Sequence, residues 1–262
     1  MTVPLHAVES GAGPPLAILH GLFGSGRNWA SIAQHLAAHR RVIAFDLRNH
    51  GASSWADTMS YGEMADDVRA SLHSRGYDRY ALLGHSMGGK AAMTAALEHG
   101  DEVERLIVVD IAPAAYPPRH LGYVQAMRRL DLARIKRRSE ADARLAPEIP
   151  DPAERGFLVQ NLVFENGEAR WRLNLEAIER EMPRLVGFPE ISAGRSYDGR
   201  SYDGPALFVA GGRSDYLRPE HEQAIRRLFP KAQIAEIDNA GHWVHAEQPA
   251  AFLSIVAPFL GE

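Results

Sequence analysis

The chain has 262 residues, 45% of them apolar, and a formal net charge of −4. This length suits one large α/β domain or a domain with a substantial insertion. The small negative charge gives no sign of a nucleic-acid partner or a membrane-surface protein. There is no cysteine, which excludes disulfides, thiolate zinc sites and a cysteine nucleophile.

The start of the chain predicts a strand and gives no targeting signal. Apolar and polar residues alternate over residues 3–8, which favours a first strand. The first residues have neither the basic nor the apolar region of a signal peptide. No apolar run approaches the roughly twenty residues that span a bilayer. We therefore expect a cytoplasmic protein without a membrane partner.

A glycine-rich loop follows the next predicted strand. Residues 16–19 are apolar and run into HGLFGSGRNW at residues 20–29. At the carboxyl end of a buried strand, such a loop leaves backbone N–H groups free to point into a cleft. Beside the serine turn described below, we favour an oxyanion-stabilising loop over a plain strand-to-helix connection with Trp29 in the core.

Two helices and a strand precede the serine turn. Residues 29–38 have helical spacing, residues 41–45 predict the strand, and residues 61–75 predict an amphipathic helix. Asp46 and Arg48 follow the strand at its carboxyl end, where ligand-facing loops occur in parallel sheets. We nevertheless expect these two side chains to form a structural ion pair or turn.

The stretch YALLGHSMGGK, residues 80–90, predicts a strand, a sharp turn that carries Ser86, and the start of a helix. Its pattern G-x-S-x-G places glycines where the turn leaves no room for side chains. The turn holds the hydroxyl above the sheet, and the N–H groups of the new helix point at the same spot. A glycine-rich turn that happens to contain serine is the alternative. Between an apolar strand and an alanine-rich helix, we interpret the stretch as a nucleophile elbow.

A helical insertion is predicted after the elbow helix. Residues 103–109 form an apolar strand that closes with Asp110, and from Pro113 the pattern becomes helical with no convincing strand. We predict an α/β fold, a mostly parallel sheet covered by helices on both faces, with a helical cap inserted after Asp110. The predicted domains are a first core segment (1–112), the cap (113–204) and a second core segment (205–262). The cap helices are expected at residues 123–132, 139–145, 153–164 and 173–185. A solvated helix face is expected to carry the basic residues Arg128, Arg129, Lys136, Arg137 and Arg138.

The cap ends in a tandem repeat, GRSYD at residues 194–198 and again at residues 199–203. We expect a mobile surface loop, because its composition offers almost no apolar surface to bury. Strands over residues 206–210 and 233–237 and a final helix over residues 249–260 complete the sheet domain.

A serine hydroxyl needs an adjacent base, usually an oriented histidine. His242 fits this role, because it follows a strand in DNAGHWVH and lies at the same sheet edge as Ser86. It also comes last in the chain order serine, acid, histidine. His20 and His85 lie near the site, and we expect them to pack and to form hydrogen bonds with the loops.

Six motifs in order carry a family resemblance: HGLFGSGRNW, DLRNHGAS, GHSMGGK, VDIAP, GGRSDY and NAGHWVHAEQP. Over its whole length the chain resembles an α/β-hydrolase, and more narrowly the small YbfF-type esterases. The resemblance implies a serine hydrolase without metal or organic cofactor that acts on carboxylic esters or thioesters. The expected partner is therefore a small-molecule ester, and the expected assembly a monomer or small homo-oligomer.

Two aspartates compete for the acid position. Asp110 ends the strand beside the elbow strand, and Asp215 follows the next strand, where most α/β-hydrolases carry the acid. In the YbfF-type pattern the position matching Ser214 is usually serine, and the aspartate of VDIAP resembles the acid. Asp215 falls one residue late for that alignment, although it lies four residues before Pro219 as the usual acid would. We favour Asp110 and keep Asp215 as the alternative.

The expected reaction is acyl transfer to water in two steps. His242 takes the proton as Ser86 attacks, and an aspartate orients the imidazole. The N–H of Met87 and that of Leu22, or of Phe23, hold the oxyanion.

A narrow apolar acyl site is expected, because the cap entrance offers no obvious charge-binding pair. Short and medium acyl chains should therefore be preferred. A haloperoxidase or a carbon–carbon bond hydrolase would use the same three groups. A binding module on a degenerate hydrolase fold is disfavoured, because both the serine and the histidine are present. The residues expected to contact substrate are Phe23, His85, Tyr116 and Tyr123, with Met127 and Phe164 at the cap entrance.

Overall fold

A seven-stranded sheet forms the centre of the molecule. The computed structural model describes residues 1–188 and 200–261. All neighbouring strands are parallel except the first pair, which is antiparallel. In spatial order the strands are β1 (Ala7–Ser10), β3 (Arg41–Phe45), β2 (Pro15–Leu19), β4 (Tyr80–His85), β5 (Val103–Val109), β8 (Ala206–Gly211) and β9 (Ala232–Ile237).

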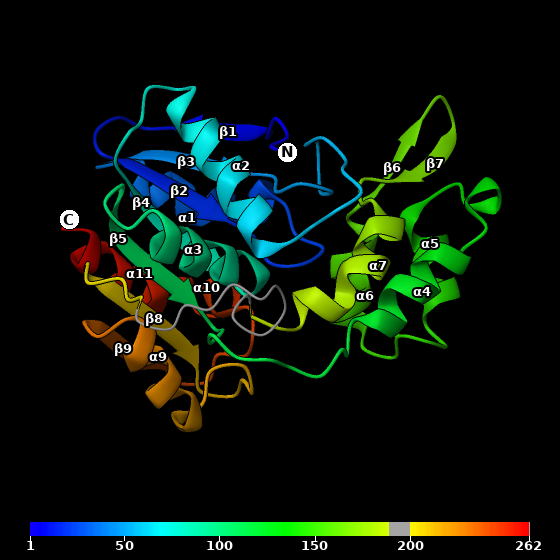
Figure 1. The fold of residues 1–262 in the computed structure, drawn as a ribbon. Helices are drawn as coiled ribbons and strands as arrows, with labels where there is room; N and C mark the ends of the chain where they lie inside the picture. Colours follow the sequence, from blue (N-terminus) through cyan, green and yellow to red (C-terminus); the bar gives the residue numbers. More distant parts are fainter. Residues whose placement is uncertain (189–199, 262) are drawn as a thin grey trace.

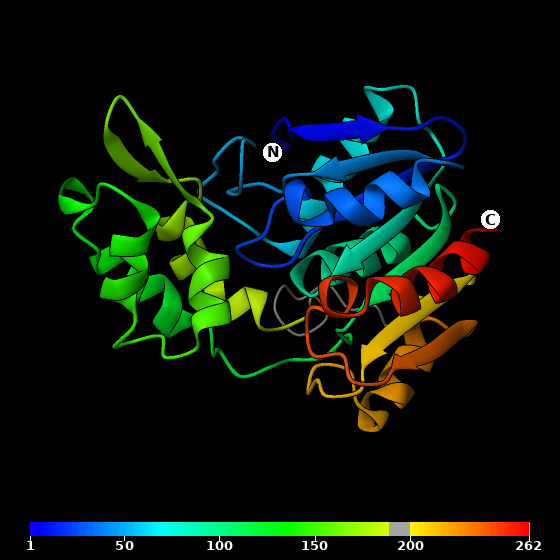
Figure 2. The same cartoon turned by 180° about the vertical axis from the view of Figure 1, so that it is seen from behind.

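Helices cover both faces of this sheet (Figures 1 and 2). Every residue of β4 is buried, as expected for a strand with helices on both sides. One apolar cluster joins the sheet to α2 (Tyr61–His73), α3 (Met87–Glu98) and α9 (Glu222–Leu228). The other joins it to α1 (Ala30–Leu36) and α11 (Pro249–Leu260). The predicted fold class is confirmed.

The first strand lies further along the chain than its pattern predicted. The pattern favoured residues 3–8, whereas β1 is Ala7–Ser10. The backbone donors of the earlier residues are used elsewhere: the N–H of Val3 donates to Asp67 at 2.7 Å, and that of His6 donates to Ser53 at 2.8 Å. Proline 4 has no N–H to donate, so no ladder forms before Ala7.

The inserted region stands beside the carboxyl ends of the parallel strands, where their arrowheads point in Figure 1. Short 3₁₀ turns occur at η1 (Gly26–Trp29), η2 (Leu132–Arg134) and η3 (Pro219–His221), and a one-turn helix at α10 (Val244–Glu247). The inserted elements are α4 (Leu121–Arg129), α5 (Arg138–Leu145), α6 (Pro152–Val159), β6 (Leu162–Glu165), β7 (Glu168–Trp171) and α7 (Leu175–Leu185).

The expectation of a cap without strands is wrong, because β6 and β7 form an antiparallel hairpin. The helix predicted over residues 153–164 ends at Val159 instead. Asn166 and Gly167 form the turn with φ of 52° and 82°. An Asn-Gly pair favours a two-residue hairpin turn in which both residues have positive φ. This dipeptide therefore indicated the hairpin, although no strand was predicted there.

The five basic residues of the cap are exposed, as expected, but they lie at the end of α4 and around the start of α5 rather than on one helix. Arg128 pairs with Glu179 and Arg129 with Glu148, while Arg137 pairs with Glu140. Arg138 differs, because its Nε donates to the carbonyl of Leu162 at 3.0 Å.

Asp46 and Arg48 are structural, but not as a pair with each other. The guanidinium of Arg48 binds the buried carboxylate of Asp67, with Nε–Oδ2 at 2.6 Å. Asp46 instead accepts the N–H groups of Gly26 and Ala52, each at 2.8 Å, and so fixes the loops around it.

A buried lysine on the elbow helix joins both connections to the cap. The Nζ of Lys90 donates to the carbonyls of Ala114, Val186 and Gly187, at 2.9, 3.1 and 2.6 Å. Ala114 lies where the chain leaves the sheet for the cap, and the other two lie where it returns. Burial lowers the pKa of Lys90 to about 7. The cap is therefore attached to the helix that follows Ser86.

The structure describes only residues 200–203 of the tandem repeat, where Arg200, Ser201 and Asp203 are exposed outside any helix or strand, as a surface loop requires. The first copy of the repeat and Gly199 lie outside the described residues. In the second copy Tyr202 is only 2% exposed, and its hydroxyl donates to the carbonyl of Val103 at 3.0 Å. Its ring lies edge-on to Phe229. The expectation of a loop with almost nothing to bury is therefore wrong for this residue.

Tyr202→Ala should lower the free energy of unfolding by about 3–5 kcal/mol, because it leaves a cavity between strand and helix. Tyr202→Phe, which loses only the hydrogen bond, should cost about 1 kcal/mol. Urea denaturation of both variants measures the difference. Equal, small effects would contradict the packing role of the ring.

No helix within residues 1–188 and 200–261 is both long enough and apolar enough to cross a membrane.

Candidate active site

Ser86 stands on a strained turn between β4 and α3. Its φ is 51° and its ψ −117°, a backbone conformation that L residues rarely adopt. A side chain at Gly84 would collide with the carbonyl of Gly88, and one at Gly88 would collide with the carbonyls of Leu19 and His20. Both glycines of the pattern are thus required by close backbone contact, and the turn holds the serine at the carboxyl edge of the sheet.

A buried carboxylate contacts the imidazole of His242. Asp110 Oδ2 lies 2.7 Å from His242 Nδ1, and the Asp110 side chain is fully buried. The N–H of Gly211 donates to its other oxygen at 3.0 Å, and the hydroxyl of Ser214 donates to Oδ2. With Nδ1 donating to the carboxylate, Nε2 is the basic nitrogen of the neutral ring.

Asp215 lies elsewhere. It is exposed and pairs with Arg218 three residues along the chain. The aromatic ring of Tyr216 stacks on His242, with ring centroids 4.0 Å apart. The structure therefore brings Asp110 and Ser214 to His242, and places Tyr216 rather than Asp215 against its ring.

Neutral histidines support the surrounding loops. His20 Nδ1 donates to the carbonyl of Gly21 at 2.8 Å, and its Nε2 accepts from the N–H of Leu47 at 2.9 Å. His85 Nε2 donates to the carbonyl of His242 at 2.8 Å. Burial lowers the pKa of both rings below the ordinary histidine value. These contacts match the packing and hydrogen-bonding roles expected for them.

Of the two backbone N–H groups in the glycine-rich loop that were candidates to hold the oxyanion, one already donates to another group. Phe23 has a φ of 63°, and its N–H donates to His50 Nε2 at 3.2 Å. Burial lowers the pKa of His50 to about 3, so its ring stays neutral and can accept this bond. Within the described ranges, the N–H of Leu22 has no such contact. Met87 opens α3, and its N–H is one of the helix's unpaired first-turn donors.

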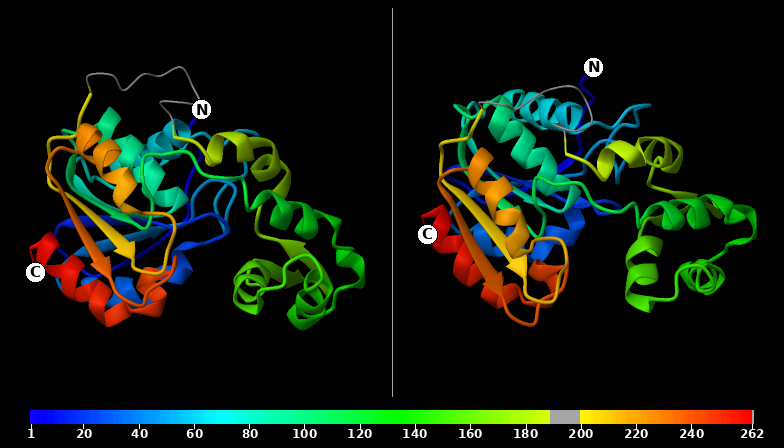
Figure 3. Two further views of the ribbon diagram at one scale, coloured as in Figure 1. Left: turned by 90° about the horizontal axis from the view of Figure 1, so that it is seen from below. Right: turned by 60° about the horizontal axis from the view of Figure 1, so that its bottom comes forward.

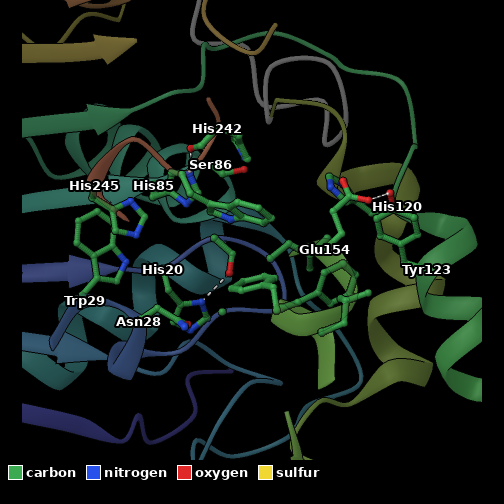
Figure 4. A pocket seen from close by; sticks show the side chains of 17 residues that line it. His20, Asn28, Trp29, His85, Ser86, His120, Tyr123, Glu154, His242 and His245 are labelled. Carbon is green, nitrogen blue, oxygen red and sulfur yellow. Dashed lines mark hydrogen bonds between the residues drawn. The ribbon is translucent and has the colours of Figure 1, made fainter. Parts of the chain in front are cut away.

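Two pockets meet at Ser86. The main pocket, of about 60 Å³, lies between the core and the cap, and its lining is mostly apolar. Figure 4 shows Ser86, His85 and His242 on its core side and His120, Tyr123 and Glu154 on its cap side. The side pocket, of about 40 Å³, is lined by Met87, Lys90, Tyr116 and their neighbours. Leu22, Ser86 and His120 line both pockets.

The residues expected to contact substrate divide between these pockets. Phe23, His85 and Tyr123 line the main pocket, and Tyr116 lines the side pocket. Two residues expected at the cap entrance do not line either pocket: Met127 is fully buried in the cap, and Phe164 is exposed on the hairpin.

Sequence reasoning missed other pocket residues. His120 lies between Phe23 and Tyr123, and burial lowers its pKa to about 4. Phe157 and Trp243 line the main pocket and pack their rings together, with centroids 5.3 Å apart. The GHWVH motif and the helical pattern around residue 157 indicated their elements, but nothing in either pattern showed which side chains face the serine.

Three metal-ligating side chains come together in the part of the chain that the structure describes. They are Asp66, Glu98 and His99. Glu98 ends α3, whereas Ser86 precedes its first residue, so this group lies a full helix length away from the pockets. The absence of a metal or cofactor at the serine site stays a prediction.

Comparison with known proteins places this geometry in a family. A family model described as the alpha/beta hydrolase fold matches residues 14–249. The chain belongs to the α/β-hydrolase family. This confirms the resemblance, and with it the superfamily.

Among the relatives of this α/β-hydrolase is the sn-1-specific diacylglycerol lipase ABHD11 of Mus musculus. It is 40% identical over 255 residues, which cover 94% of this chain and 81% of the relative. The esterase YbfF of Escherichia coli is 34% identical over 249 residues, covering 95% of this chain and 93% of the relative. A solved structure titled "Marine microorganism esterase" matches with a TM-score of 0.92 and 36% identity, covering 98% of this chain and all of that one.

Proposed function

We propose that this chain is a carboxylic ester hydrolase that forms an acyl-enzyme on Ser86. The observation that carries the proposal is the contact of His242 Nδ1 with the buried carboxylate of Asp110, at 2.7 Å, in the loop facing the serine turn. The similarity to proteins named as esterases and lipases supports ester cleavage. Cleavage of thioesters would follow the same steps.

In the first step the Ser86 oxygen attacks the ester carbonyl and its proton passes to His242 Nε2. Asp110 keeps the ring in the correct tautomer and stabilises the imidazolium. The tetrahedral intermediate then collapses: the bond between the carbonyl carbon and the alcohol oxygen breaks, and the alcohol takes the proton from His242. In the second step water attacks the acyl-serine and gives a proton to His242. The bond between the acyl carbon and the Ser86 oxygen then breaks, His242 returns the proton to that oxygen, and the acid leaves.

The oxyanion is held by the N–H groups of Met87 and Leu22. Leu22 is preferred over Phe23, because the Phe23 N–H already donates to His50. The N–H of Met87 is supplied by the first turn of α3. Losing one donor of this kind costs about 3 kcal/mol in the barrier.

The substrate class follows from the size and lining of the main pocket. Its volume of about 60 Å³ and its apolar lining, which includes Phe23, Phe157 and Leu158, suit an acyl chain of short to medium length.

With p-nitrophenyl esters, kcat/KM should be highest between butanoate and octanoate and should fall steadily toward palmitate. The longer chains would have to displace the contact between Phe157 and Trp243, which line the pocket. A chain-length series measured below the micelle-forming concentration of each ester tests this. A kcat/KM that rises as far as palmitate would contradict it and would align the chain with its lipase relatives.

A cofactor-free haloperoxidase or a carbon–carbon bond hydrolase would use the same three side chains, and the relatives' names favour neither. Covalent labelling by a fluorophosphonate separates an enzyme from a binding module, because only an activated serine reacts. Hydrolysis of the ester panel then separates an esterase from the other two reactions.

A further inference from the structure

A second, larger cavity adjoins the main pocket. Its volume is about 270 Å³, compared with about 60 Å³ for the main pocket. Phe23 and Asn28 line both spaces, so the two adjoin at these side chains. The larger space is lined by the guanidinium groups of Arg27, Arg138 and Arg172. We call it the arginine cavity.

The three arginines come from distant parts of the chain. Arg27 lies in η1 at the end of the glycine-rich loop, Arg138 opens α5, and Arg172 follows β7. Figure 3 shows the cap standing beside the sheet domain. The buried side chain of Asn161 closes the seam between the two, since its Nδ2 donates to the carbonyl of Phe23 at 2.8 Å.

The charges in this cavity are not neutralised as they are elsewhere on the cap. Arg128, Arg129 and Arg170 each pair with a glutamate. Within residues 1–188 and 200–261, neither Arg27, Arg138 nor Arg172 forms an ion pair by direct contact with a carboxylate. Arg172 interacts only at longer range with Glu165, whose pKa it helps to lower.

One carboxylate does line the cavity, that of Asp46. Its two oxygens accept the N–H groups of Gly26 and Ala52 at 2.8 Å, and His6 approaches it at 3.3 Å. The orientation of Asp46 is fixed by these contacts, so it does not fold over to pair with the guanidiniums. Three positive groups therefore face a space that one negative group offsets only in part.

We propose that the arginine cavity binds an oxyanion group, a carboxylate or phosphate, beside the ester site. Guanidinium groups bind planar carboxylates and phosphates through paired N–H donors. Because Phe23 and Asn28 line both spaces, an ester with an acidic group at the far end of its acyl chain can occupy both. A separate small anion offers the same chemistry. The substrate-borne form of this proposal rests on the proposed esterase function.

The substrate-borne form is tested with two esters of equal acyl length. Mono-p-nitrophenyl adipate carries a terminal carboxylate, and p-nitrophenyl hexanoate does not. The quantity measured is the ratio of their kcat/KM values. Arg172→Gln should lower this ratio about tenfold or more, because one charge-assisted hydrogen-bonded contact is lost. Arg138→Gln should act in the same direction.

The matched control starts from Arg170→Gln. Arg170 lies two residues before Arg172 on the same hairpin and pairs with Glu165, with Nε–Oε2 at 2.8 Å. Arg170 does not line the cavity, but its partner Glu165 also interacts with Arg172. The control therefore carries Glu165→Gln as well, and the ratio should stay within about twofold of wild type. An equal fall in this double variant would reveal a general effect of the charges on the hairpin and would overturn the substrate-borne form.

The second arm uses inorganic phosphate as the probe and requires no catalysis. If the cavity takes a free anion, phosphate should raise the Tm of the wild-type chain more than an equal ionic strength of sodium chloride does. Arg172→Gln should lose this difference, and the double-variant control should keep it.

The two arms separate the outcomes. A changed ester ratio supports a substrate-borne anion, and a phosphate effect that depends on Arg172 supports a free one. If neither quantity depends on Arg172 or Arg138, the cavity is not an anion site. If no ester is hydrolysed at all, the proposed function fails, and the phosphate arm still decides the cavity.

Discussion

Ser86→Ala and His242→Ala should each lower kcat for ester hydrolysis by about 10⁴-fold or more, because the nucleophile and its base act as one unit. Ser86 holds the reacting oxygen on the strained turn, and His242 is oriented by Asp110. Removing either leaves only binding and the oxyanion donors. Hydrolysis of p-nitrophenyl butanoate measures the loss, and fluorophosphonate labelling should disappear in Ser86→Ala.

The matched control is His39→Ala, which changes an exposed histidine away from both pockets. It should keep wild-type kcat. Circular dichroism of all three variants shows whether they fold. A folded Ser86→Ala or His242→Ala variant that keeps a tenth of the wild-type kcat would contradict the proposed roles.

Asp110→Asn should lower kcat by about 10³–10⁴-fold, whereas Asp215→Asn should lower it by less than about tenfold. The amide of asparagine cannot accept from Gly211, Ser214 and His242 together, so it favours the wrong tautomer of the imidazole. Asp215 faces solvent and pairs with Arg218. Its charge has little influence on His242 through water.

The reverse order of the two asparagine variants would show that Asp215 orients the histidine. Comparable large losses in both would mean that neither single assignment stands. Ser214→Ala gives an intermediate test: its hydroxyl donates to Asp110 and not to the imidazole, so its loss should have a modest effect on kcat.

The sheet and its elbow could be predicted because their constraints are local. Apolar runs gave β3, β5 and the final helix with the bounds that the structure has. The glycines around Ser86 follow from backbone collisions that any sequence with this turn must avoid.

The choice between two aspartates could not be made from the sequence alone. Asp110 and Asp215 follow β5 and β8, which are neighbouring parallel strands, so both reach the same edge of the sheet. What separates them is one residue of register in the loop after β8, which turns Ser214 inward and Asp215 outward. Such a difference is a matter of side-chain direction. The triad itself stays a proposal until the asparagine variants are measured.

The cap was harder for a similar reason. Its Asn-Gly dipeptide indicated a hairpin turn, but the helical periodicity of the flanking residues favoured helices instead. The roles of Arg138 and Arg172 depend on which segment lies across the seam, and no local pattern encodes that. Tyr202 likewise belongs to a polar repeat in the sequence, and its burial depends on contacts with residues distant in the chain, such as Val103.

The position of Lys90 has a consequence for exchanging caps among members of this family. Its ammonium binds the carbonyls of Ala114, Val186 and Gly187, so the departing and returning connections end at one point. In a chimera whose two junctions lie between these carbonyls and the sheet, the foreign cap would bring its own three carbonyl acceptors. Such a graft needs a recipient with lysine four residues after the serine, since otherwise three buried carbonyls lose their donor. The boundary of the transferable module is therefore set by one side chain of the recipient.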